Sequence, residues 1–98
     1  MTEEEMHEAL FVSLVAMFQG AAIQQMGKLI NPMTGKVERD LEQAKLSIDI
    51  LGMLEAKTKG NLTEDEQRLL SHALFELRMN YLDEVNKPQS TEGEEEKK

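Results

Sequence analysis

The sequence contains no cysteine and no tryptophan, and it has only two histidines, two prolines and six glycines among 98 residues. Without cysteine the chain can form neither a disulfide nor a thiolate-ligated zinc site. It also has no Ser-His-Asp spacing, no His-Glu-x-x-His motif and no glycine-rich phosphate loop. We therefore expect no cofactor, no metal ion, no catalytic residue and a protein that is not an enzyme.

Basic charge is also scarce, because 11 lysines and arginines face 19 acidic residues and leave a net charge of −8. Residues 1–8 alone carry four glutamates and no base. Such a surface repels phosphate backbones, and no basic stripe with interleaved aromatics is present, so we expect no nucleic-acid partner. The acidic start also lacks the basic region of a signal peptide, and we expect a cytoplasmic protein.

The length of the chain allows one small domain with a single core. Apolar periodicity predicts an all-α, three-helix bundle over residues 1–86, with helices at about 3–28, 40–58 and 63–86 and no strand. Residues 87–98 have mixed charge and no large apolar side chain, so we expect a disordered tail.

Capping signals mark the starts of the second and third helices. Asp40 precedes Gln43 by three residues, and Thr63 precedes Glu66 by the same distance, which is the spacing of an N-terminal capping pair. Gly60 is suited to the left-handed conformation that ends a helix. The connections between the helices are therefore predicted to be short.

The first predicted helix has almost no polar face between residues 9 and 23. A helix that is apolar all round is normally buried, but three helices of this size cannot enclose one of their own number. The apolar side chains that the other two helices leave uncovered would form a large exposed patch, so we predict a homo-oligomer, with a dimer favoured. The alternative is a module that docks on a membrane surface through this helix. The acidic N-terminus disfavours that alternative, and the apolar run is too short for a membrane span.

Small residues form one stripe along the first predicted helix: Ala9, Ser13, Ala16, Gly20 and Gly27. Small side chains let two helix backbones approach closely. Two interpretations follow from this pattern. The stripe accepts the third helix of the same chain, or it accepts the first helix of a second copy.

Second apolar stripes are predicted on the other two helices, and we interpret them as a secondary interface with a further copy or an unknown protein partner. On the third helix this stripe consists of Phe75, Met79 and Leu82, with Arg78 beside it. On the second helix it consists of Leu46, Ile50, Met53 and Leu54. Arg78 is either exposed and unpaired, paired with Asp49 or Asp83, or placed to reach across a dimer.

Three short strings resemble a known bacterial family: Asn-Pro-Met-Thr-Gly at 31–35, Lys-Thr-Lys-Gly-Asn-Leu-Thr at 57–63, and Leu-Arg-Met with a following tyrosine at 77–81. The chain resembles domain of unknown function 1844 (DUF1844) over about residues 9–85. The resemblance implies a small helical protein of the bacterial cytosol, and it carries over no catalytic residue. We interpret the segment 31–35 as a connector between helices, with a recognition loop as the alternative.

Overall fold

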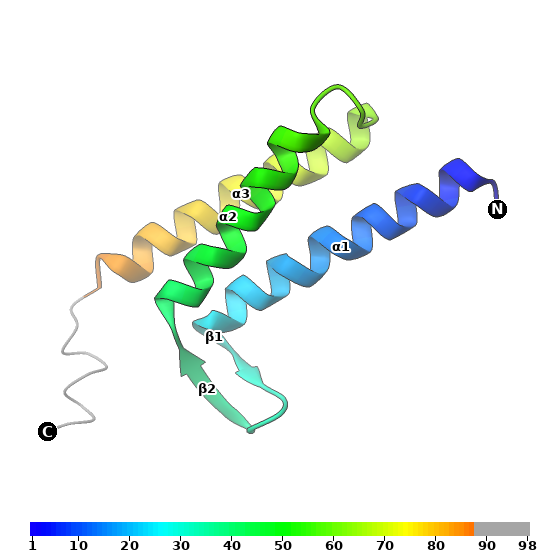
Figure 1. Ribbon diagram of the computed structural model, residues 1–98. Helices are drawn as coiled ribbons and strands as arrows, with labels where there is room; N and C mark the ends of the chain where they lie inside the picture. The colour runs from blue at the N-terminus through cyan, green and yellow to red at the C-terminus, as the bar shows by residue number, and fades with distance from the viewer. Residues whose placement is uncertain (88–98) are drawn as a thin grey trace, which may run out of the picture.

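The computed structural model describes residues 1–87, which form three helices and a two-stranded hairpin (Figure 1). The order is α1 (Glu3–Gln25), β1 (Met26–Asn31), β2 (Lys36–Arg39), α2 (Leu41–Thr58) and α3 (Glu64–Val85). The prediction of a small, mostly helical fold with three helices is confirmed. The predicted tail lies outside the described residues except for Lys87, whose side chain is hydrogen-bonded to α3.

Each helix begins at a side-chain cap. Thr63 accepts a hydrogen bond from the backbone N–H of Glu66, and the Glu66 carboxylate accepts one from the backbone N–H of Thr63. Thr2 and Glu5 form the same reciprocal pair at the start of α1. The Asp40 side chain caps the first turn of α2. Because these caps satisfy backbone N–H groups that have no partner within the helix, they fix where each helix starts.

The segment between α1 and α2 differs from the sequence-based prediction. The first helix does not reach residue 28 but ends at Gln25, and residues 26–39 form an antiparallel hairpin in place of an entirely helical fold. Gly27 explains the difference, because its φ of 85° is left-handed and stops the helix. Ile30 then pairs with Val37, and the pairing is irregular between Met26 and Ile30.

The turn of the hairpin accounts for the Asn-Pro-x-Thr-Gly string. The Asn31 side chain accepts a hydrogen bond of 2.8 Å from the backbone N–H of Met33. The Thr34 hydroxyl accepts one of 3.3 Å from the backbone N–H of Lys36. Gly35 supplies a left-handed φ of 73°. The segment predicted to be a connector between helices therefore lies in the connection from α1 to α2, where it forms the turn between two paired strands.

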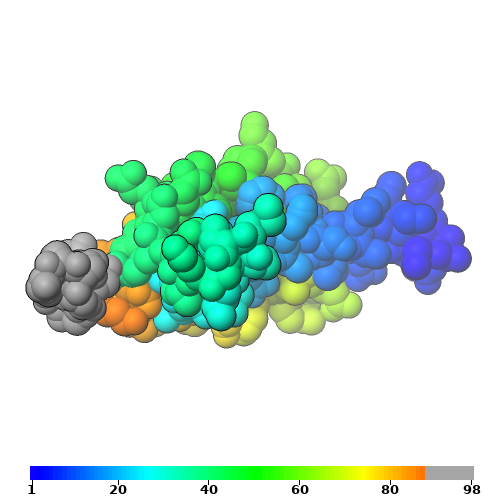
Figure 2. Space-filling model, turned by 90° about the horizontal axis from the view of Figure 1, so that it is seen from below, coloured from blue at the N-terminus to red at the C-terminus, as the bar shows by residue number. Residues whose placement is uncertain are grey.

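The hydrophobic core lies where the three helices meet. Its fully buried members come mostly from α2 and α3: Ala44, Ile48, Leu51, Leu70, Ala73, Leu74 and Leu77. From α1 only Val15 and Ala22 are buried, and Met26 closes the end next to the hairpin. The described helix α1 lies along the α2–α3 pair, and its N-terminal half extends past them at one end (Figure 2).

Candidate interaction surface

The outward side of α1 is the largest run of exposed apolar side chains on one helix of the described chain. Its large members are between 36% and 63% exposed: Met6, Leu10, Val12, Leu14 and Met17. Only Val15 and Ala22 of this helix are buried, and Phe11, Phe18 and Ile23 pack partly against the core. The helix that the sequence predicts to be apolar all round therefore has one side in the core, and residues 1–87 leave its other side uncovered.

The predicted small-residue stripe lies on that uncovered side of α1. Ala9, Ser13 and Ala16 are exposed, and Gly20 is half-buried. At 100° per residue these four positions fall on the side away from Val15 and Ala22. A side-chain carbon added at Gly20 would meet no atom within 4 Å. The stripe is therefore not covered by α3 of the same chain.

Gly27, the fifth predicted member of the stripe, belongs to β1 and not to α1. Its left-handed backbone removes it from the helix, so its spacing from Gly20 does not place the two on one face. A Cβ at this position would lie 3.3 Å from the Cβ of Arg39. Gly27 therefore allows the hairpin to close against Arg39, and the stripe has four members.

The predicted secondary interface is also exposed. Phe75, Met79 and Leu82 are each more than half exposed on α3. Beside them runs a groove of about 290 Å³ lined by Lys45, Ile48, Asp49, Arg78, Tyr81 and Leu82. The groove is shallow and has a charged rim formed by residues of α2 and α3.

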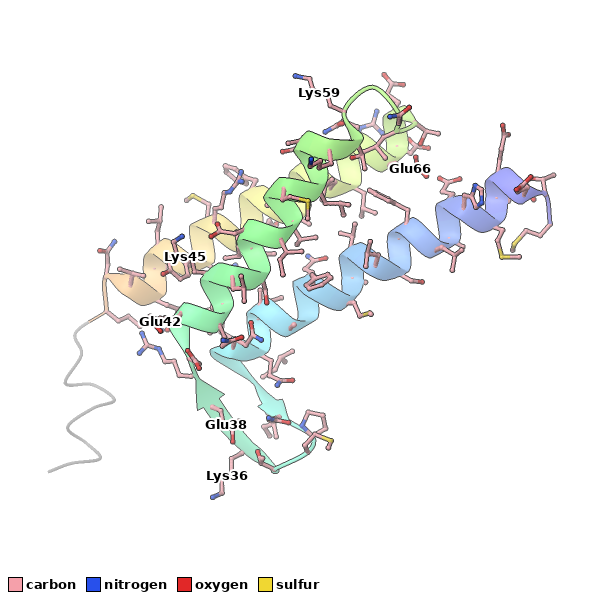
Figure 3. The ribbon with its side chains drawn as sticks, in the orientation of Figure 1. Lys36, Glu38, Glu42, Lys45, Lys59 and Glu66 are labelled. Carbon is pink, nitrogen blue, oxygen red and sulfur yellow. The ribbon has the colours of Figure 1, made fainter. Side chains whose placement is uncertain are left out.

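The Arg78 side chain lies against Gly52 of α2. A Cβ added at Gly52 would be 3.0 Å from the Arg78 Nη2 atom, so the guanidinium rests over the glycine. Asp49, one of the two partners considered from the sequence, is bound instead by Lys45 at 2.9 Å (Lys45 is labelled in Figure 3). This hydrogen bond raises the pKa of Lys45. Asp49 is paired with Lys45, and within residues 1–87 Arg78 forms no ion pair with either Asp49 or Asp83.

A buried charge cluster joins the hairpin to the end of α3. Glu84 is only 3% exposed. Its carboxylate accepts from Lys28 Nζ at 3.0 Å, Arg39 Nε at 3.2 Å and Lys87 Nζ at 2.8 Å. Arg39 also donates to the Glu84 carbonyl at 2.8 Å. No local sequence pattern predicts this cluster, because its members come from three separate segments of the chain.

The pKa of the Glu84 carboxyl reflects two opposing causes. Burial disfavours the charged form and raises the pKa, but the hydrogen bonds from Lys87, Lys28 and Arg39 favour the carboxylate and prevail. The pKa falls to about 2. Glu84 is therefore ionised at neutral pH, and it holds three cations around one negative charge.

The acidic start of α1 faces a cleft of about 600 Å³ near the beginning of α3. The cleft is lined by Thr2, Glu4, Glu5, His7, Glu8, Asn61, Thr63 and Glu66. His7 Nε2 lies 3.9 Å from Glu3, and both side chains are well exposed. No group of three potential metal ligands comes together in the part of the chain that the structure describes. These carboxylates act on the helix starts, through the caps and the helix dipole.

By length and composition α1 also meets the requirements for a helix that crosses a membrane. Only 11% of its most apolar window is buried inside this chain. A core helix or an N-terminal signal sequence passes the same test. The expectation that the apolar run is too short for a span is therefore not supported by the helix length.

Comparison with known families decides where the chain belongs. A family model described as "Domain of unknown function (DUF1844)" matches residues 8–83. The chain is a member of the DUF1844 family. No curated protein and no solved structure matches it. The DUF1844 match extends from the second turn of α1 through the hairpin and α2 and almost to the end of α3, so it includes most of the uncovered face of α1.

Proposed function

We propose that this DUF1844 protein is a non-enzymatic self-association module whose homodimer forms through the outward side of α1. The supporting observation is the continuous apolar surface that includes Met6, Leu10 and Met17, which no other element of the described chain covers. Monomeric soluble proteins seldom leave a patch of this kind in water. A second copy presents the same surface, so that one association covers both patches.

The small residues on this surface favour a helix as the covering element. The small-residue stripe on α1 consists of Ala9, Ser13, Ala16 and Gly20, and the larger side chains of Leu10 and Met17 lie beside it. A second α1 helix packed on this stripe brings the two backbones close and adds dispersion contacts along the whole interface. Larger side chains at the positions of the stripe would keep the two helices apart.

The exposed stripe on α3 extends the same proposal. Phe75, Met79 and Leu82 form a secondary interface, either with a further copy or with a different protein, and Arg78 at its edge has no ion pair within residues 1–87. The α2 residues Leu46 and Met53 are similarly exposed. Because methionine adapts its shape to a neighbour, this surface suits an interaction partner better than it suits a small ligand.

A light-scattering measurement on purified full-length protein tests the α1 interface. We expect the unmodified chain to have twice the 11.1 kDa mass of one copy at micromolar concentration. The double variant Leu10→Glu with Met17→Glu should have the mass of one copy, because it places charges in the seam. The control Gln43→Glu with Ala56→Glu adds the same charge at exposed positions of α2 and should leave the dimer intact. A single-copy mass for the unmodified chain would exclude the proposal.

The alternative function is a peripheral membrane module that docks through α1. The length and apolar character of this helix favour it, whereas the exposed Glu3, Glu4 and Glu5 oppose binding to anionic lipid. Flotation with zwitterionic and with anionic vesicles distinguishes the two functions. Binding to zwitterionic vesicles that is lost in Leu10→Glu with Met17→Glu would favour the membrane function, and protein that stays unbound would exclude it.

A further inference from the structure

We propose that the groove between α2 and α3 binds a helical segment of another protein, whose apolar side chains fill the groove while one of its carboxylates binds Arg78. This inference rests on the secondary interface of the proposed function and does not depend on the α1 dimer. It adds the chemistry of the partner, which follows from the position of the Arg78 guanidinium and from the residues around it.

Residues of α2 and α3 alone line the groove. They are Lys45, Ile48, Asp49, Arg78, Tyr81 and Leu82, around a volume of about 290 Å³. Ile48 is buried, Tyr81 is half-buried and Leu82 is exposed. Phe75 and Met79, both exposed, continue the apolar surface along α3. The groove therefore offers an apolar contact to a partner even when the outward side of α1 is covered.

Gly52 determines where the Arg78 guanidinium lies. It is in the interior of α2, where glycine is less favourable than alanine. A Cβ added at Gly52 would be 3.0 Å from the Arg78 Nη2 atom, which is tighter than most side-chain contacts. Because Gly52 has no side chain, the guanidinium rests on the backbone of α2 at the edge of the groove.

The N–H donors of Arg78 are available to a partner. A guanidinium has five such donors. Lys45 binds Asp49 at 2.9 Å, and within residues 1–87 Arg78 has no ion pair of its own with that carboxylate. At 100° per residue, Asp83 projects from α3 at about 140° from Arg78. A planar guanidinium placed beside apolar side chains is suited to bind a carboxylate through two hydrogen bonds.

A second hollow meets the groove at Gly52. It has a volume of about 460 Å³ and is lined by Gly52, Glu55, Ala56, Lys59 and Gln67. Lys45 of the groove and Lys59 of the hollow both lie on the side of α2 turned away from α1 (Figure 3). The groove and the hollow therefore form one surface along the α2–α3 pair, with the Arg78 guanidinium between them.

The charges that line this α2–α3 surface include one base more than acids. The charged residues of its lining are Lys45, Lys59, Arg78, Asp49 and Glu55. The Glu55 carboxylate accepts hydrogen bonds from two neighbouring side chains of α3. The exposed acids Glu42 and Asp83 line neither the groove nor the hollow. In a chain with a net charge of −8, this surface therefore suits a partner that carries a carboxylate.

The length of the α2–α3 surface fits a helix of about fifteen residues. From Gln67 at one end to Leu82 at the other, it extends about 22 Å, or four helical turns, along α3. On the α2 side, the small residues Gly52 and Ala56 lie one turn apart and leave room for a backbone. An amphipathic helix in such a groove buries residues at spacings of three and four.

Two other occupants fit this surface less well. Residues 88–98 carry four glutamates but no large apolar side chain, so they cannot fill the groove. A second copy related by a two-fold axis would bring Arg78 of each copy near the same residue of the other, because Arg78 lies between the groove and the hollow. A different protein that carries a carboxylate on an apolar helix face satisfies both the groove and the guanidinium.

Peptide selection on the full-length protein tests the docking site. A displayed library of random helical peptides of about fifteen residues is selected on the unmodified chain and counter-selected on Arg78→Gln. We expect the enriched peptides to have large apolar residues at spacings of three and four, with an aspartate or glutamate among them. Enriched peptides without an acidic residue, or no enrichment over the counter-selection, would refute the docking site.

Titration of an enriched synthetic peptide measures the contribution of Arg78. We expect Arg78→Gln to raise the dissociation constant about tenfold or more. Arg78→Lys should raise it less, because lysine keeps the charge but lacks the planar pair of donors. The control Arg68→Gln removes the same charge from α3 at a position paired with Asp65, outside the surface, and should leave binding unchanged. An equal loss in the control would show that net charge alone binds the peptide.

Gly52→Ala tests the position of the guanidinium separately from its charge. The added Cβ displaces only the far end of a flexible side chain, so the fold should be at least as stable in thermal unfolding. The displaced guanidinium should bind the peptide more weakly than in the unmodified chain. Unchanged peptide binding would contradict the role of the glycine.

Light scattering keeps this proposal distinct from the α1 dimer. Arg78→Gln should have the same mass as the unmodified chain. A fall in mass confined to Arg78→Gln would assign the groove to a second copy and overturn the proposal. A single-copy mass for the unmodified chain would exclude the α1 dimer and leave the docking site standing, because one copy contains the whole groove.

Discussion

Glu84 is the residue that holds the hairpin on the end of α3. Its carboxylate is buried and accepts from Lys28 and Arg39 of the hairpin segment as well as from Lys87. We expect Glu84→Gln to lower the free energy of unfolding by about 2–4 kcal/mol, because it leaves cations around a site that has lost its charge. Urea denaturation at pH 7 measures this loss. Asp83→Asn, at the exposed neighbouring position, is the control and should change little.

The same residue gives the protein a definite acid response. The pKa of Glu84 is about 2 in the folded chain, against an ordinary value of 4.5. Because the folded value is the lower one, the carboxylate stabilises the fold above pH 4.5, and this contribution is lost as the pH falls toward 2. Denaturation midpoints measured across this window should fall more steeply for the unmodified chain than for Glu84→Gln. If the denaturation midpoints of the two proteins changed equally with pH, the low pKa of Glu84 would be contradicted.

A substitution at Gly20 tests whether a second copy covers the outward side of α1. Among residues 1–87, no atom beyond the local backbone of α1 lies within 4 Å of a Cβ added at Gly20, so Gly20→Leu should raise helix stability by about 0.5–1 kcal/mol. In the proposed dimer the same leucine enters the seam and should weaken association. We therefore expect a more stable fold and a weaker dimer, measured by denaturation of the monomer at high dilution and by light scattering. The combined variant Ala16→Leu with Gly20→Leu should show the larger loss of dimer.

At the scale of the elements, the hairpin depends on two left-handed glycines. Gly35 in the turn has a φ of 73°, and Gly27 at the end of α1 has a φ of 85°. Gly35→Ala should cost about 1 kcal/mol through backbone strain alone. Gly27→Ala should cost more, because its Cβ also presses on Arg39. Thermal unfolding of the two variants checks this order, and equal losses would contradict the close approach to Arg39.

The sequence predicts where the helices begin, but it does not reveal the hairpin. The starts of α2 and α3 were predicted within one residue, because Asp40 and Thr63 act on backbone groups three positions away. The hairpin was missed, since its strands are short and its start depends on the backbone conformation of Gly27. Because the first helix was predicted to continue through Gly27, this glycine was wrongly assigned to the small-residue stripe. The partners of Glu84 come from distant segments, and no periodicity in the sequence reveals them.

At the scale of the whole molecule, the described chain leaves one long helix half covered. Its principal extents of 56 × 26 × 16 Å describe an elongated shape, in which α1 packs against the α2–α3 pair with one side and leaves the other side exposed. A second copy that adds its own α1 would cover that exposed side. The apolar surface of α1 that the described residues leave exposed is the surface that we propose self-association buries.

Sedimentation equilibrium of the full chain over a range of concentrations tests this assignment most directly. We predict a mass twice that of the 11.1 kDa chain at high concentration, which declines toward one copy on dilution. A mass of one copy at every concentration, with α1 stable in solution, would contradict the central claim.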